Sequence, residues 1–165
     1  MHHYRMILGF DIDNASGIIY NTIMKYNVVI DTNVLISALR SRDGASFLLI
    51  SLLGENDKFD IYITVALILE YEVAAKRLLG KIQITEDVID DVIDYICQIG
   101  NEQQVFFLWR PFLKDPNDDM VLELAVAAGC NFIITHNKQD FKNIQEFGLQ
   151  AISPVEFLRI IGVIK

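Results

Sequence analysis

The sequence predicts an α/β fold in which helices flank a central parallel sheet. Segments of β-branched residues alternate with segments of helical periodicity, which is typical of parallel sheets with right-handed crossovers. The clearest strand is 28–30, where three β-branched residues follow one another with no polar position between them, as expected of a strand buried on both faces. With 165 residues, the chain is long enough for one domain with a single substantial core.

The first strand leads directly to a candidate site residue. Strand 28–30 ends on Asp31, and apolar residues at helical spacing over 34–39 predict a helix after it. A carboxylate at the carboxyl end of a central parallel strand lies in the crevice where open α/β sheets bind ligands. The alternative is that Asp31 only caps the helix, because Asp, Thr and Asn all favour that position. This segment alone leaves both interpretations open.

The next elements repeat the alternation. Apolar residues at helical spacing predict a second helix over 45–53, after a polar loop at 40–44, and Gly54 ends this helix. The apolar cluster at 59–63 predicts a second buried strand, and Thr64 begins a third helix.

Glu70 lies on this third helix, close to its apolar border. As an isolated feature it is an ordinary surface residue paired with a Lys or Arg. Its position soon after a parallel strand's end favours a second interpretation, in which it leans over the same crevice as Asp31.

The middle of the chain predicts one more helix and one more strand. Thr85 caps a helix with acidic residues in its first turn, where the helix dipole favours anions, and Gly100 ends it. The aromatic-rich segment 105–109 is predicted to be a short strand that Pro111 closes.

The last third holds a second acidic cluster and three further elements. Segment 114–119 is predicted to be a turn, because it combines Pro and Asn with acids, and a helix with many alanines follows from Met120 to the stop at Gly129. Two strands are predicted at 131–135 and 149–152.

The final helix has an explicit start signal. Ser153 is its cap, Pro154 occupies the first helical position, and Glu156 completes a Ser-x-x-Glu capping box. We therefore expect a helix from Pro154 onward.

Several oxygen-bearing side chains are predicted at one edge of this sheet. Carboxylates that converge in one crevice raise one another's pKa values, so they require a counter-charge to ionise together. A hard divalent cation supplies it, and ligands that are all oxygen favour Mg²⁺ or Mn²⁺ over zinc. The chemistry implied is metal-dependent phosphodiester hydrolysis. The candidate ligands are Asp31, Glu70, Asp118 and either Asn137 or Asp140.

Composition adds two expectations. Hydrophobic residues make up 52% of the chain and the mean hydropathy is +0.31, yet no apolar run approaches the roughly 20 residues that a membrane span requires. We therefore expect an exposed apolar patch that a partner protein or a second copy covers. The net charge of -8 argues against non-specific nucleic-acid binding through global charge, but it does not exclude a nuclease whose acids hold metal.

Cys97 and Cys130 lie in apolar contexts without metal-binding spacing, so we expect both to be small core residues of a protein in a reducing compartment, the cytoplasm.

Residues 1–23 are interpreted separately. They contain a strand-like run that ends in Asp11 and Asp13, which resembles the first motif of haloacid-dehalogenase phosphatases, but the later motifs of that family are missing. Met24 precedes the central strand directly and is a natural start. We expect 1–23 to be an amino-terminal extension, from a mis-assigned start, and 24–165 to form the nuclease domain.

Four motifs in order resemble the PIN-domain ribonucleases, and most closely the VapC-like toxins of bacterial toxin-antitoxin systems. They extend over about residues 25–160. The resemblance implies a three-layer PIN-like fold with a central parallel sheet, and a metal-dependent endoribonuclease. The motifs are Asp31-Thr32-Asn33-Val34-Leu35, Leu69-Glu70-Tyr71, Asp115-Pro116-Asn117-Asp118-Asp119 and Ile134-Thr135-His136-Asn137.

The resemblance also implies roles for single residues. Asp31, Glu70 and Asp118 correspond to the metal-binding acids, with Asn33, Asp115 and Asp119 supporting them and Thr135 positioning water or an acid. The family often has a fourth acid two residues after the threonine, where this chain has Asn137. An amide oxygen brings no charge, which weakens binding of a second ion, although Asp140 can compensate. For His136 the better interpretation is a polar residue at a strand end.

The implied substrate is RNA, and the implied partners are a cognate antitoxin and a second copy in a homodimer. One rival interpretation is an RNA- or protein-binding module that lost activity with the fourth acid, and another is a phosphatase using Asp11 and Asp13. The expected RNA-binding residues are Arg40, Arg42, Lys76, Arg77 and Lys138, although basic side chains of this kind often serve only solubility.

Overall fold

The computed structural model describes residues 25–106 and 110–165. The extension at 1–23, including the Asp-x-Asp of the phosphatase hypothesis, lies outside the described residues, as do residues 107–109. The strands are β1 (Tyr26–Ile30), β2 (Phe59–Ile63), β3 (Asn101–Glu102), β4 (Phe132–Ile134) and β5 (Gln150–Ile152). The helices are α1 (Thr32–Arg40), α2 (Ala45–Ser51), α3 (Val65–Lys76), α4 (Glu86–Ile99), α5 (Pro116–Ala127) and α6 (Pro154–Ile160), with short 3-10 turns at Lys138–Asp140 and Ile144–Phe147.

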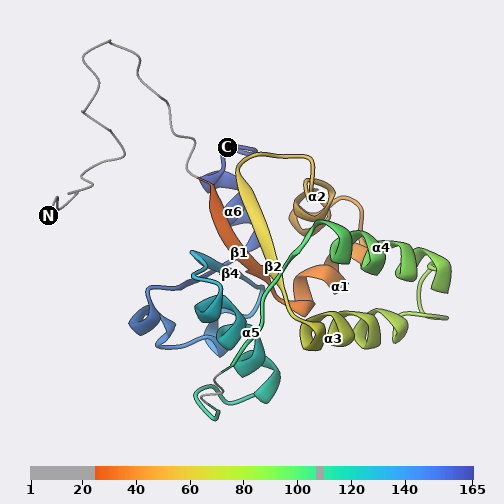
Figure 1. Ribbon diagram of the computed structural model, residues 1–165. Helices are drawn as coiled ribbons and strands as arrows, with labels where there is room; N and C mark the ends of the chain where they lie inside the picture. The colour runs from red at the N-terminus through yellow and green to blue at the C-terminus, as the bar shows by residue number, and fades with distance from the viewer. Residues whose placement is uncertain (1–24, 107–109) are drawn as a thin grey trace, which may run out of the picture.

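The described strands form one parallel sheet with β1 at its centre. The strand order is β3-β2-β1-β4-β5, and Val28 of β1 pairs with Ile61 of β2 on one side and Phe132 of β4 on the other. Helices surround this sheet (Figure 1). The predicted α/β fold with a central parallel sheet is therefore confirmed.

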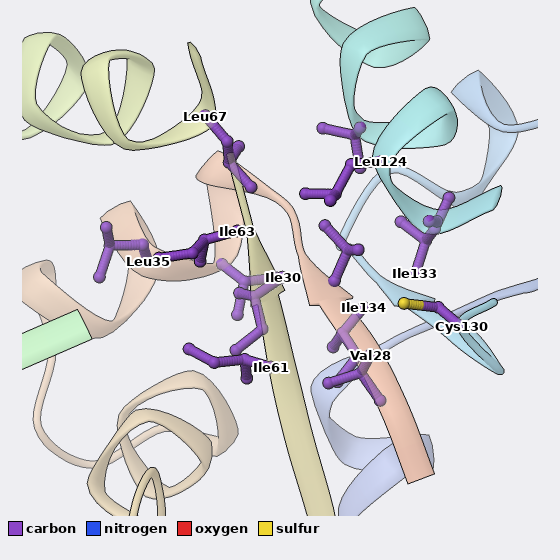
Figure 2. Packing of buried hydrophobic residues seen from close by; sticks show 14 of the residues in the cluster. Val28, Ile30, Leu35, Ile61, Ile63, Leu67, Leu124, Cys130, Ile133 and Ile134 are labelled. Atoms are coloured by element: carbon purple, nitrogen blue, oxygen red, sulfur yellow. The ribbon is translucent and has the colours of Figure 1, made fainter. Parts of the chain in front are cut away.

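The two faces of the sheet are covered by different helices. Partners in parallel register share a face, so Val29 and Ile133 face one way and Val28 and Phe132 the other. On the second face, the ring of Phe157 in α6 packs edge-on against Phe132, with centroids 5.9 Å apart. On the first face, α5 contacts β1 and β4. Figure 2 shows Leu124 and Ile133 on one side of the strands and Leu35, Ile61 and Ile63 on the other. Together they form the three predicted layers.

The third described strand lies before the segment predicted at 105–109, of which residues 107–109 lie outside the described residues. Val105 and Phe106 belong to no strand, and Phe106 is 79% exposed. The strand is Asn101–Glu102, directly after α4. Gly100 permits this close approach, because a Cβ there would lie 2.8 Å from the Ile96 carbonyl oxygen and 2.9 Å from the Ile63 side chain. Without that atom, the chain approaches β2 as soon as the helix ends and pairs there.

The predicted turn at 114–119 is also wrong in part, because α5 already begins at Pro116. Asp115 is the N-cap and accepts a hydrogen bond from the Asn117 amide at 2.9 Å, while Pro116 occupies the first helical position. The Pro and Asn that suggested a turn are therefore a helix start. Asp118 and Asp119 consequently lie in the first turn of α5.

Three smaller expectations have clear outcomes. The capping box is present, with Ser153 accepting from the Glu156 amide at 3.2 Å and Glu156 accepting from the Ser153 amide at 2.7 Å.

Cys130 is buried, but Cys97 is exposed on α4, so the prediction of two core cysteines is wrong for Cys97. Within the described part of the chain, no helix combines the length and apolar character needed to cross a membrane.

Candidate functional site

Asp31 stands at the carboxyl end of the central strand and is held by side chains rather than used as a cap. It occupies the N-cap position of α1, yet its carboxylate makes no capping hydrogen bond. Its Oδ2 instead accepts from the Thr135 hydroxyl and from Asn33 Nδ2, both at 2.6 Å. Asp31 is therefore more than a helix cap. Burial raises the pKa of Asp31, against the lowering effect of the Thr135 hydroxyl.

Asn33 and Thr135 form a frame around this carboxylate. Asn33 Nδ2 also donates to Thr135 Oγ1 at 3.1 Å, and Asn33 Oδ1 accepts from the His136 amide at 3.1 Å. Thr135 is fully buried and its Oγ1 accepts from the Asn137 amide at 2.9 Å. The end of β1 and the end of β4 are thus joined through side chains, which fixes the direction of Asp31.

Glu70 reaches the same region from α3. Its neighbour Tyr71 is buried and donates a hydrogen bond to the Ile30 carbonyl, which attaches α3 to the last residue of β1. Burial is the main cause that raises the pKa of Glu70, and the charges of Asp31 and Asp115 raise it further. The nearby Thr32 hydroxyl and Arg77 oppose this increase. This role of Tyr71 was not predicted, because the sequence analysis named Tyr71 only as the neighbour of Glu70 in a motif.

Among the carboxyl groups of the site, that of Asp118 has the most strongly shifted pKa. Burial and then the charges of Asp31, Asp115, Asp140 and Glu70 raise its pKa to about 7, from an ordinary value of 3.8. These four acids come from different parts of the chain, so their combined effect shows that Asp118 faces the cluster.

Asp119 is directed elsewhere. It is buried in the first turn of α5, and its Oδ1 accepts from the amides of Phe112 and Leu113 at 3.2 and 2.7 Å. The carboxylate therefore fixes the loop that precedes α5. Neighbouring helical residues differ by about 100° in direction, which explains why Asp118 and Asp119 have separate surroundings.

A cavity of about 480 Å³ brings the acids and two arginines together. Asp31, Glu70, Asp115 and Asp118 line it, and so do Asn33, Arg40 and Arg77. Four further polar residues of its lining were not predicted as site residues, and these are Thr32, Ser37, Ser41 and Asn117. Helical spacing could have indicated Ser37 and the C-cap residue Ser41, because they follow Asn33 at intervals of four residues and so lie on one side of α1.

The other predicted site residues lie outside this cavity. Lys76 pairs with Glu72 at 2.7 Å and with Glu86 at 3.3 Å, and Lys138 pairs with Glu156 at 2.9 Å. Arg42 is exposed in the loop between α1 and α2. Asn137 and Asp140 are exposed beyond β4, near enough for the Asp140 charge to raise the pKa values of Asp31 and Asp118.

The oxygen atoms of the acidic side chains in the cavity are suitable ligands for a hard divalent cation. Glu70 Oε2 is buried, and no hydrogen-bond partner for it occurs in residues 25–106 and 110–165, so a cation could satisfy it. The neighbouring donors are all oxygens, which matches Mg²⁺ or Mn²⁺. In the same residues, no three Asp, Glu, His or Cys side chains stand close enough to hold one ion as they are arranged. Joint coordination of one ion would therefore require the carboxylates to move closer together.

Comparisons with known proteins agree with this architecture. A VapBC2 structure from Rickettsia felis, bound to a DNA fragment from its promoter, is similar at a TM-score of 0.54 and 14% identity, covering 76% of this chain and 98% of that one. A VapBC-1 structure from nontypeable Haemophilus influenzae is similar at a TM-score of 0.55 and 18% identity, covering 78% and 98%. A search of curated proteins found no match. The sequence model of the PIN domain matches residues 27–139, which include all four acids of the cavity, and the chain therefore belongs to the PIN-domain family.

Proposed function

We propose that this protein is a Mg²⁺- or Mn²⁺-dependent endoribonuclease, and the toxin of a type II toxin-antitoxin pair that acts in the cytoplasm. The observation that carries the proposal is the cavity at the end of β1, where Asp31, Glu70 and Asp118 have raised pKa values and Arg40 and Arg77 share the lining. Membership of the PIN-domain family supports it.

The acids and the arginines have separate roles in this proposal. Asp31, Glu70 and Asp118 would hold the cation, which activates a water molecule and offsets charge on the pentacoordinate transition state when bound. Asn33 and Thr135 keep Asp31 in place through their hydrogen bonds. Arg40 and Arg77 bind backbone phosphates of the RNA beside the scissile bond. Asp115 caps α5 and so orients Asp118.

Asn137 is the weak point of the ligand set and supports the second candidate function. Its side chain brings an oxygen without a charge, and both it and Asp140 lie outside the cavity lining. A PIN-type module that binds RNA or protein without cutting is the alternative that this substitution favours.

The surface of α3 supports a protein partner. Val65, Leu69 and Val73 recur every four residues and are 65%, 55% and 53% exposed. The two similar structures are both VapBC complexes. We therefore propose that this protein is held inactive by a cognate antitoxin and forms a homodimer through its apolar surface.

Cleavage of a mixed RNA substrate tests the proposal. Protein freed of any co-purified partner should cut RNA with Mn²⁺ or Mg²⁺, and both EDTA and the Asp31→Asn variant should abolish cutting. Protein that starts at Met24 should cut equally well if 24–165 is the complete nuclease domain. A folded protein that cuts nothing under any metal would favour the binding module, and loss of cutting on truncation would refute the proposed domain boundary.

A further inference from the structure

A side-chain contact outside the cavity joins α2 to the end of β4. Ser46 lies in the first turn of α2 and is only 3% exposed, and its Oγ is 2.8 Å from Nε2 of His136. The two residues are 90 positions apart in the chain, and which of them donates depends on the tautomer of the ring. The imidazole of His136 is therefore tied to a buried group even though the residue is exposed.

The backbone on both sides of this imidazole belongs to the frame of Asp31. The His136 amide donates to Asn33 Oδ1, and the Asn137 amide donates to Thr135 Oγ1. Asn33 and Thr135 both donate to Asp31 Oδ2. Ser46 is thus connected through His136 to the residues that hold the Asp31 carboxylate.

We propose that the Ser46–His136 pair is a positioning strut, which holds the loop at 135–137 against α2 and so sets the place of Asn137 relative to Asp31. This inference rests on the proposed function for its catalytic consequence. His136 does not itself line the cavity, and its amide reaches the lining only through Asn33, so it is a positioning residue that acts through Asn33 and Thr135.

The loop after β4 requires side-chain contacts to hold it in place. Residues 136–140 are all exposed, and β4 ends at Ile134, so sheet pairing does not order them beyond Thr135. Each side-chain hydrogen bond that holds such a loop reduces its open population several-fold. The buried Ser46 hydroxyl provides an anchor that moves little, because α2 packs against α1 and α6.

Amide hydrogen exchange in the metal-free protein tests the strut directly. The Ser46→Ala variant should exchange the His136 and Asn137 amides about five- to tenfold faster than wild type, because it removes the anchor and leaves His136 to water. Ser51→Ala is the matched control, since Ser51 lies on the same helix and bonds only locally, to the Leu48 carbonyl at 2.8 Å. Unchanged exchange in Ser46→Ala would overturn the proposal.

Two substitutions of His136 separate a strut from a general structural role. In His136→Gln the side-chain amide lies near the position of Nε2 and can still bond Ser46, so the backbone amides of residues 136 and 137 should exchange about as slowly as in wild type. In His136→Asn the side chain is too short to reach Ser46, so the same amides should exchange faster. In the Mn²⁺-loaded enzyme, His136→Asn should lower kcat severalfold with KM for RNA little changed, and should weaken Mn²⁺ binding in titrations. Equal behaviour of the Gln and Asn variants would contradict the strut.

These readouts distinguish the two proposals. If wild type cut no RNA while exchange changed as expected, the strut would stand as a structural device and the nuclease assignment would fall. If wild type cut RNA and the Ser46→Ala variant matched it in exchange and kcat, the nuclease assignment would stand and the strut would fall.

Discussion

Because Asp118 lies among other carboxylates, we expect the neutral substitution Asp118→Asn to stabilise the metal-free protein. The pKa of Asp118 is about 7 in the folded protein against an ordinary value of 3.8, so the folded state binds this proton more tightly than the unfolded chain. Stability is therefore lost as the pH rises from about 4 to about 7, and the loss is constant above that range. The full shift corresponds to about 4 kcal/mol, since each pKa unit is about 1.4 kcal/mol.

Two effects reduce this figure for Asp118→Asn. The Asp118 side chain is partly exposed, so solvent screening brings the recoverable free energy down to about 1.5–2 kcal/mol. Asp118 also lies in the first turn of α5, where losing a negative charge costs about 0.5 kcal/mol against the helix dipole. A net gain of about 1 kcal/mol remains, which raises the melting temperature by about 2–4 °C in a domain of this size.

Thermal unfolding in EDTA at pH 8 and pH 4.5 measures the effect. The Asp118→Asn variant should melt at a higher temperature than wild type at pH 8, and the difference should nearly vanish at pH 4.5. Asp87→Asn is the matched control, because Asp87 is also an acid in the first turn of a helix, but it is exposed and lies on α4, outside the cavity lining. An Asp118→Asn variant that melts at or below the wild-type temperature at pH 8 would refute the inference that burial and the neighbouring carboxylates make the ionised Asp118 costly in the metal-free protein.

Two further predictions concern RNA and metal. Replacing Arg40 and Arg77 by Ala should weaken RNA binding and reduce the slope of log K against log salt by about 1.4, because each phosphate contact on a single strand contributes about 0.7. The double Ala variant of Lys76 and Lys138 should leave binding nearly unchanged in the same fluorescence-anisotropy titration, since both side chains pair with carboxylates outside the cavity, and a large effect would contradict this placement. Asn137→Asp should lower the Mn²⁺ concentration needed for half-maximal cleavage, and equal or poorer metal dependence would show that position 137 does not act as a ligand.

Elements with complete local signals were predictable from the sequence. Strand β1 follows from three consecutive β-branched residues, and α6 follows from a capping box whose two hydrogen bonds are both present. Strand β3 was not predictable, because Asn101–Glu102 has little strand propensity and pairs at a point where Gly100 lets the chain lie close to β2. The residues around Gly100 do not indicate from the sequence alone that the chain approaches β2 there.

The same distinction applies to the candidate site. The positions of Asp31 and Glu70 could be inferred because a strand end and its following helix are adjacent in sequence. The resemblance distinguished Asp118 from Asp119, but the partners of Asp119 were not apparent, since the amides that bind it belong to a loop with no distinctive sequence. The ion pair between Lys138 and Glu156 was not apparent either, because Glu156 comes from α6. Long-range ion pairs of this kind leave no pattern in one sequence.

The central claim is that Asp31, Glu70 and Asp118 jointly hold one divalent cation. Anomalous diffraction from crystals soaked in Mn²⁺ tests it most directly, since the signal locates the ion without any assumption about activity. The account predicts a peak in the cavity at the end of β1, with oxygens of Asp31 and Asp118 about 2.1 Å from the ion and Glu70 within direct or water-bridged reach. A peak at another place, or no peak at millimolar Mn²⁺ in a well-ordered crystal, would contradict it.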